Sequence, residues 1–295
     1  MPAQLRVVRR RIRSVQSTMK ITKAQELIAA SRLVRAQTRV EQSRPYTRQL
    51  TTALSEIATT EGRLDHPLLE RRPEVRAAAV VVLTSDRGFA GPYNANVLRT
   101  TEELLARLRG DGIEPRLYVA GRKGVSYYRF RQRPLAQSWT EVSDQPRYDD
   151  ARKIADAVLG AFLENEVDEI HTVFTDFVSP MVQRPVAVRF IPLVVEEGTE
   201  RPPQPIPMYV FEPDAEAVLD ALLPRYIAAR MFTAMLESAA SEWAARRRAM
   251  SSATDNAEEL VEDLTREYNQ ARQAAITQEI MEIVGGAEAL QQSGS

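Results

Sequence analysis

The chain has no cysteine and only two histidines, His66 and His171, among its 295 residues. The missing thiols exclude disulfide bonds, thiolate zinc sites and cysteine nucleophiles. The two histidines are far apart in the sequence, and neither stands at a metal-ligand spacing or in a Ser/His/Asp arrangement. We therefore expect no catalytic residue, no cofactor-binding residue and no metal site, so the protein is predicted not to be an enzyme by itself.

Long apolar segments are also missing. No stretch approaches the roughly 18 apolar residues that a membrane-spanning helix needs, and no signal-peptide core follows the arginine-rich N-terminus. The hydrophobic fraction of 44% and the charged fraction of 27% are ordinary for a folded protein. We expect a folded chain that does not itself cross a membrane.

Acidic residues are scarce in the first 50 residues, although the net charge of the whole chain is −1. Only Glu26 and Glu41 oppose 12 arginines and lysines in this segment. Such a one-sided segment predicts an acidic partner, which could be nucleic acid, anionic lipid or acidic protein loops. The alternative is a basic helix face that is merely solvated.

Glycine is absent before Gly62, and Pro45 is the only proline between residues 3 and 62. Apolar residues recur here at the three- and four-residue spacing of a coiled coil: Leu5, Val8, Ile12, Val15 and Met19. A shifted series, which predicts a stutter, follows: Ile21, Ala24, Ile28, Leu33 and Ala36. A helix over Pro2 to Ile57 would be about 80 Å long, and Pro45 should kink it or end its regular part.

The C-terminal part has the same character. Residues 225–284 contain neither glycine nor proline, so we expect Pro224 in the first turn of a second long helix and Gly285–Gly286 at its end. The coiled-coil spacing continues through Ala253, Ala257, Leu260, Leu264, Tyr268, Ala271 and Ala275. This helix would be about 90 Å long, and two helices of matched length predict an antiparallel hairpin within one chain. A coiled coil between two chains is the alternative.

The middle of the chain has the pattern of an α/β domain. The β-branched run Ala77–Leu83 predicts a buried strand, and Tyr93–Leu108 has a helical pattern. Further strand candidates are Leu117–Val119, Ile170–Phe174 and Val186–Val195. The alternation predicts a small, mostly parallel, Rossmann-like sheet with helices on its faces.

The predicted organisation is therefore a helix over residues 1–62, an inserted α/β domain over residues 76–208, and a second helix over residues 214–290 that packs on the first. Two segments rich in proline and charge, Arg63–Pro73 and Glu196–Pro207, are predicted to be the linkers.

The sequence SDRGFAGPYN, Ser85 to Asn94, forms a glycine-containing turn between a strand and a helix, where phosphate binders often sit. It has no GxxxxGK[ST] pattern, no GxGxxG pattern and no nearby Walker lysine. We therefore predict a structural turn in which Asp86 and Arg87 pair with each other or contact a neighbour. An enzyme with its site at this turn is an alternative, and it would bind nucleotide.

Three segments resemble one known family. MKITKAQELIAASRLVRAQ at Met19–Gln37, the turn SDRGFAGPYN, and SSATDNAEELVEDLTREYNQARQAAITQEIMEIVGGAEAL at Ser251–Leu290 resemble the signatures of the gamma subunit of F-type ATP synthase. The order of the three matches that of the family, and the resemblance covers essentially the whole chain.

The resemblance implies a central rotor without a catalytic site of its own, present in one copy per complex. Its partners in that family are the alpha and beta subunits, which form a hexameric ring, the epsilon subunit and the membrane c-ring. Proton flow turns the shaft, and the shaft couples this flow to ATP synthesis or hydrolysis at the beta subunits. Membrane association is then indirect and peripheral, on the cytoplasmic side of the cell membrane.

Carried over to this sequence, the resemblance places contacts to the beta subunits at Lys20, Lys23, Arg272, Gln273 and Gln278. An arginine fork at Arg272 can hold a carboxylate in a fixed direction. The C-terminal tip, Ile280–Leu290, is predicted to turn in an apolar bearing. An alternative from another class is a coiled-coil protein that binds nucleic acid through the basic N-terminal helix.

Overall fold

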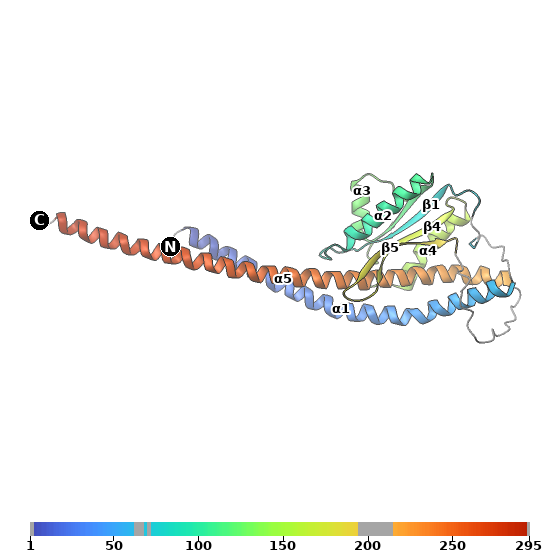
Figure 1. The fold of residues 1–295 in the computed structure, drawn as a ribbon, viewed down its shortest axis with the longest axis horizontal. Coiled ribbons are helices and arrows are strands. Elements are labelled where there is room, and N and C mark those ends of the chain that lie inside the picture. The colour runs from blue at the N-terminus through green and yellow to red at the C-terminus, as the bar shows by residue number, and fades with distance from the viewer. Residues whose placement is uncertain (1–2, 62–67, 70–71, 194–214, 294–295) are drawn as a thin grey trace. The chain divides into compact units, whose positions relative to one another are not determined.

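The computed structural model describes residues 3–61, 68–69, 72–193 and 215–293 (Figure 1). Its elements are, in chain order, α1 (Ala3–Glu61), β1 (Ala77–Leu83), α2 (Tyr93–Gly110), β2 (Glu114–Ala120), α3 (Arg122–Phe130), β3 (Gln137–Trp139), α4 (Tyr148–Leu163), β4 (Glu169–Phe177), β5 (Gln183–Ile191) and α5 (Ala215–Ser293). The chain divides into two compact units, residues 1–29 with 247–295, and residues 30–246. No helix in the described ranges has the length and apolarity needed to span a bilayer.

The sheet of the larger unit has the strand order β3-β2-β1-β4-β5. The pairs β1/β2, β1/β4 and β2/β3 are parallel, and β4/β5 is antiparallel. These pairings confirm the mostly parallel α/β sheet. The predicted strands overlap β1, β2, β4 and β5, and the predicted helix overlaps α2; the last two residues of the predicted strand Val186–Val195 lie outside the described residues.

Alternating residues of β1 build a core on each face of the sheet. Val80 and Val82 pack in one buried cluster with residues of α2 and α3, such as Leu105 and Tyr128. Val81 packs in the other cluster with α4 and with parts of α1 and α5, where the following side chains are buried: Ile154, Phe162, Leu54, Ile227 and Met231. The helical segments from residues 30–61 and 215–246 therefore belong to the core of the α/β domain (Figure 1).

Both long helices extend beyond their predicted ends. α1 continues through Pro45 as far as Glu61, and α5 begins at Ala215, so Pro224 lies inside it. α5 also passes through Gly285–Gly286, where we expected its end. The predictions for Pro224 and for an end at Gly285–Gly286 were wrong, and Pro45 does not end α1, which was one of the two outcomes predicted for it. Pro45 and Pro224 are exposed, so water can hydrogen-bond the freed carbonyls while the opposite side of each helix packs in the core.

In the unit formed by residues 1–29 and 247–295, α1 and α5 pair in opposite directions (Figure 1). The hydroxyl of Thr254 donates to that of Thr22 at 2.8 Å. Because both residues belong to one chain, the contact confirms the intramolecular hairpin and removes the alternative of a coiled coil between two chains. The less exposed positions of α1 here are Leu5, Val8, Ile12, Val15, Met19, Thr22, Glu26 and Ala29.

This series keeps its three- and four-residue spacing throughout, so the predicted stutter was wrong. Ile21, Ala24 and Ile28 are exposed, because Thr22 and Glu26 hold the seam positions instead. On α5 the seam was predicted correctly except at Leu260, which is 40% exposed. Polar residues at the seam hid its true register from hydrophobicity alone.

The described part of the first predicted linker is fixed to the α/β domain. Arg72 donates from Nη1 to Asp168 Oδ1 at 2.8 Å and from Nη2 to the carbonyl of Phe162 at 2.8 Å, and Leu68 is buried. The segments 63–67, 70–71 and 196–207 lie outside the described residues. The domain limits 1–62, 76–208 and 214–290 stay a prediction.

Candidate partner-binding surface

The five residues predicted to contact the beta subunits are all exposed on the helix pair of residues 1–29 and 247–295. Lys23 Nζ lies 3.0 Å from Glu26 Oε2, and Gln278 Nε2 donates to Glu282 Oε1 at 3.1 Å. Neither Lys20 nor Arg272 forms an ion pair with another residue that the structure describes. Their charges are available to a partner.

The structure separates these residues into two places. Lys20 and Lys23 flank Thr22, which contacts Thr254 on α5. Arg272 lies 18 residues beyond Thr254, which corresponds to about 27 Å along the helix. The lysines and Arg272 can therefore contact two different parts of a partner, or two partners, but not one carboxylate.

Apolar side chains are exposed along α5 beyond Arg272. Ile276, Ile280, Met281, Ile283 and Val284 are between 44% and 71% exposed. An exposed apolar cluster of this kind marks a surface that another molecule covers. The predicted bearing at Ile280–Leu290 agrees with this exposure over residues 280–285, and the side chains beyond them lie outside the described part.

The basic character of α1 is retained at its surface. The exposed cations of α1 in this unit are Arg6, Arg9, Arg10, Arg11, Arg13, Lys20 and Lys23. Exposed acids on the paired helix partly offset them: Asp255, Glu258, Glu259, Glu262, Asp263 and Glu267. The exposed acids of α5 therefore lower the net positive charge of this helix pair.

The turn Ser85–Asn94 is held by neighbours on both sides of it. Asp86 accepts hydrogen bonds from the backbone N–H groups of Arg122 and Ser143, each at 2.9 Å, and Arg87 Nε lies 2.8 Å from Asp144 Oδ2. Burial alone would raise the pKa of Asp86, but these hydrogen bonds outweigh it and keep the pKa below its usual value. Asp86 and Arg87 contact neighbours, one of the two outcomes predicted, and do not pair with each other.

A buried ion pair of α5 fixes the same turn. Arg246 Nη2 lies 2.6 Å from Glu242 Oε1 and also donates to the carbonyl of Gly88 at 3.2 Å. Burial raises the pKa of Glu242 to about 7, and the Arg246 guanidinium opposes this rise. Sequence reasoning missed this pair, although Glu242 and Arg246 have helical i, i+4 spacing in an alanine-rich stretch.

The turn lacks the space for a nucleotide. The cavity beside it, lined by residues such as Thr84, Tyr93, Ser143 and Glu242, has a volume of about 10 Å³. That volume is far below the several hundred Å³ of a cofactor pocket. Nothing in this geometry supports an enzyme with its site at the turn.

The histidines do not change this result. His171 is buried in β4, where its Nε2 lies 2.9 Å from Glu169 Oε2, and burial lowers its pKa although Glu169 opposes the shift. His66 lies outside the described residues. Among the residues that the structure describes, no group of acids and histidines could hold a metal ion.

Comparison with known proteins identifies the family. A family model described as ATP synthase matches residues 4–290. This chain belongs to that family. It is 58% identical over 295 residues to the ATP synthase gamma chain of Parafrankia sp. (strain EAN1pec), with 98% of this chain and 99% of the relative covered. It is 56% identical over 300 residues to the ATP synthase gamma chain of Acidothermus cellulolyticus, with both chains fully covered.

Solved structures agree with the fold. A chain of the Euglena gracilis mitochondrial ATP synthase (OSCP/F1/c-ring, rotational state 3) has a TM-score of 0.68 at 15% identity, with 99% of this chain and 96% of that chain covered. A chain in the rotor of the same organism's enzyme has a TM-score of 0.65 at 17% identity, with 92% and 99% covered. The family membership gives no support to the nucleic-acid-binding alternative.

Proposed function

We propose that this chain is the central rotor shaft of an F-type ATP synthase and has no catalytic site of its own. The observation that carries the proposal is the full-length similarity to ATP synthase gamma chains at more than half of the positions. The antiparallel hairpin with exposed basic and apolar side chains supports it, because a shaft enclosed by partners needs an outer surface that they can contact.

The proposed partners are the alpha and beta subunits in a hexameric ring around the helix pair, together with the epsilon subunit and the membrane c-ring. One copy of the chain serves each complex, and it is peripheral on the cytoplasmic side of the membrane. Proton flow through the membrane sector turns the ring and the shaft. An asymmetric shaft then contacts the three beta subunits differently and changes their nucleotide affinity in turn.

The proposed contacts to the beta subunits lie at two separate places on the helix pair. One set lies on α5 toward its C-terminus and consists of Arg272, Gln273 and Gln278. The exposed guanidinium of Arg272 can bind a beta-subunit carboxylate through two parallel hydrogen bonds. The other set lies on α1 and consists of Lys20 and Lys23, whose ammonium groups can attract acidic residues of a partner as point charges. Lys23 must exchange its bond to Glu26 for the partner.

The experiment is co-expression of the full chain with the alpha and beta subunits of the same organism. We expect a stable complex with one copy of this chain, whose ATP hydrolysis depends on it. Failure of the full, folded chain to co-purify with these subunits would refute the proposed function. The Arg266→Ala variant serves as a control for the contact residues, because Arg266 is exposed on the same helix but pairs with Asp263 within it.

A further inference from the structure

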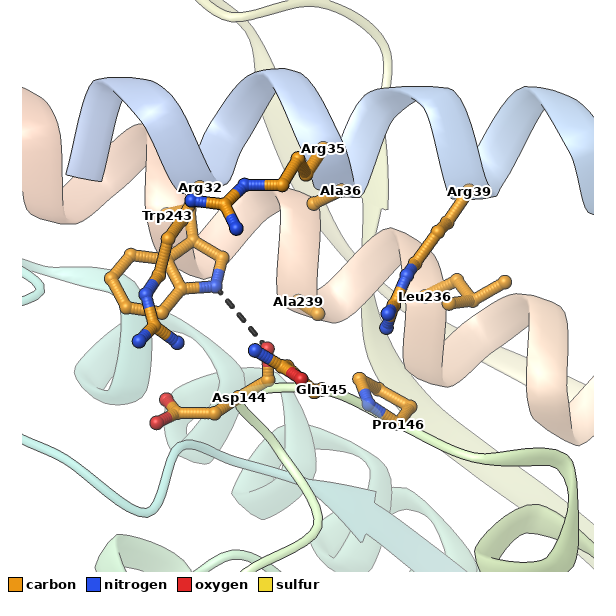
Figure 2. A pocket seen from close by; sticks show the side chains of 10 residues that line it. All are labelled: Arg32, Arg35, Ala36, Arg39, Asp144, Gln145, Pro146, Leu236, Ala239 and Trp243. Atoms are coloured by element: carbon orange, nitrogen blue, oxygen red, sulfur yellow. Dashed lines mark hydrogen bonds between the residues drawn. The ribbon is translucent and has the colours of Figure 1, made fainter. Parts of the chain in front are cut away.

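A cavity of about 130 Å³ lies within residues 30–246, between α1, α5 and the loop before α4 (Figure 2). Ala36, Leu236, Ala239 and Pro146 give it apolar walls, and Trp243 closes one end. The Trp243 indole N–H donates to the carbonyl of Asp144 at 3.4 Å, which ties the loop to α5. The cavity is therefore part of the packed fold and not a gap between loose segments.

Three arginines of α1 line this cavity. Arg32, Arg35 and Arg39 follow one another at helical spacings of three and four residues, so they share one face of the helix. In Figure 2, Arg39 reaches from α1 toward Pro146 and Leu236, across the cavity. None of the three forms an ion pair with a residue in the described part of the chain.

The other contacts of these arginines are to neutral groups. Arg35 donates to the neutral hydroxyl of Ser31 at 3.1 Å, and the Arg32 guanidinium lies 5.1 Å from the centre of the Trp243 ring. Asp144 also lines the cavity; its carboxylate is bound to Arg87 at 2.8 Å and lies on the Arg32 side of the cavity, away from Arg39 and Gln145 (Figure 2). The three guanidinium groups therefore outnumber the one carboxylate at the cavity, and that carboxylate already has a cationic partner.

This arrangement is unfavourable without a ligand. Like charges at these helical spacings repel one another, and Arg35 and Arg39 are exposed, so an anion can reach both of them from the solvent. A guanidinium binds the oxygens of a phosphate through two parallel hydrogen bonds, and the Gln145 amide lines the cavity as a further donor.

The volume decides which anion fits. A volume of about 130 Å³ is several times the ~10–15 Å³ that a single water needs, so the cavity has room for one tetrahedral oxyanion. Whole cofactors need pockets of about 300 Å³ or more, and a peptide helix is about 10 Å across. We propose that Arg32, Arg35 and Arg39 form a binding site for a single phosphate group, either inorganic phosphate or the terminal phosphate of a larger molecule.

The chain offers a direct readout of this site. It has two tryptophans, of which Trp243 lines the cavity and Trp139 stacks on Tyr118 elsewhere in the domain. In a Trp139→Phe background, the fluorescence of the full chain therefore reports on the cavity alone. Sodium phosphate is titrated against sodium chloride at constant ionic strength, and ADP and pyrophosphate are titrated in parallel.

We expect a saturable change with phosphate that chloride does not produce. Arg39→Gln and Arg35→Gln each remove charge-assisted hydrogen bonds and should raise the half-saturating concentration about tenfold or more. Arg48→Gln removes the same charge from an exposed position of the same helix outside the cavity and should change it less than about twofold. Circular dichroism confirms that each variant is folded.

Three results would overturn the site. The first is that the fluorescence shows no saturable response to phosphate, pyrophosphate or ADP. The second is that chloride produces an equal fluorescence response. The third is that Arg48→Gln and Arg39→Gln weaken phosphate binding equally. Saturation by phosphate identifies the free anion as ligand, whereas saturation by ADP or pyrophosphate alone identifies the terminal phosphate of a larger molecule. Either outcome supports the site, and neither depends on assembly with partner subunits.

Discussion

The helix pair of residues 1–29 and 247–295 and the unit of residues 30–246 are built on opposite principles. The helix pair has a single seam in which small and polar residues such as Thr22, Thr254 and Ala257 interrupt the larger apolar ones, and it exposes Ile280 and Met281. The larger unit has a close-packed apolar core on both sheet faces and a fully buried ion pair. We infer from this difference that stability resides mainly in the larger unit, and we propose that the helix pair serves partner recognition.

The largest effect on stability is expected at Gly121, where the larger unit has no room for a side chain. Gly121 has a φ of +100°, and a Cβ there would lie 2.1 Å from the carbonyl oxygen of Thr84. Gly121→Ala therefore combines backbone strain with overpacking, and should lower the free energy of unfolding by about 5 kcal/mol. Urea unfolding measures this, and Gly110→Ala, with nothing within 4 Å of its new Cβ, is the control. Equal stability of both variants would show that this turn is not tightly packed.

A smaller loss is expected at the buried ion pair. Arg246→Ala leaves the Glu242 carboxylate buried without its partner and should cost about 3–4 kcal/mol in urea unfolding. The double variant Glu242→Leu/Arg246→Met removes both charges and should be more stable than Arg246→Ala alone. If the double variant loses as much stability as the sum of the losses in Glu242→Leu and Arg246→Met, the two side chains do not interact.

Removing one leucine from each unit tests the comparison itself. Leu105 is completely buried between α2 and the sheet, so Leu105→Ala should cost about 4 kcal/mol. Leu264 lies in the seam of a unit that has only two helices to cover it, so Leu264→Ala should cost less, about 2 kcal/mol. Hydrogen exchange should also show local opening of residues 1–29 in the second variant. A global loss of protection there would contradict the separation into two parts.

Glu237 makes the larger unit sensitive to pH. Burial, and then the nearby Asp176, raise its pKa to about 7, while Arg44 opposes the rise. The folded protein then binds the proton more tightly than the unfolded chain, so this contribution to stability is present below about pH 4.5 and is lost as the pH rises through 7. Glu237→Gln should be more stable than the wild type by about 1 kcal/mol at pH 8 and should lose this advantage toward pH 5. Thermal unfolding at both pH values measures it, with the exposed Glu103→Gln as control; a gain that does not change with pH would contradict the assignment.

The smallest effect on stability is expected in the helix pair at Arg272. Because Arg272 is exposed, Arg272→Ala should change the free energy of unfolding by less than about 0.5 kcal/mol. In the assembled complex the same substitution should weaken ATP-driven proton pumping or torque, whereas Arg266→Ala should not. Unchanged pumping by Arg272→Ala would count against the contact.

The sequence predicted elements whose signal is local and periodic. The run Ala77–Leu83 became β1, and the heptad spacing found the seam up to Met19. It failed where a polar side chain took a buried position, as at Thr22, and where tertiary packing overrode a helix breaker, as at Pro224. The three-residue β3 is too short to leave a pattern.

The candidate surface was predicted unevenly for a related reason. The roles of Lys20 and Arg272 came from family resemblance, because exposed charges on a helix carry no signal that distinguishes them from solvated ones. The cavity at Arg35 and Arg39 was not predicted. Its opposite wall, including Pro146 and Trp243, is distant in sequence and is brought near only by folding.

Direct observation of rotation tests the account most directly. Because the chain has no cysteine, Ser126→Cys on exposed α3 gives a single attachment point for a bead. The chain is assembled with its alpha and beta subunits, which are fixed to a surface, and ATP is added. The account predicts that the bead turns in one direction while ATP is hydrolysed. A complete complex that hydrolyses ATP at its full rate while the bead stays still would contradict it.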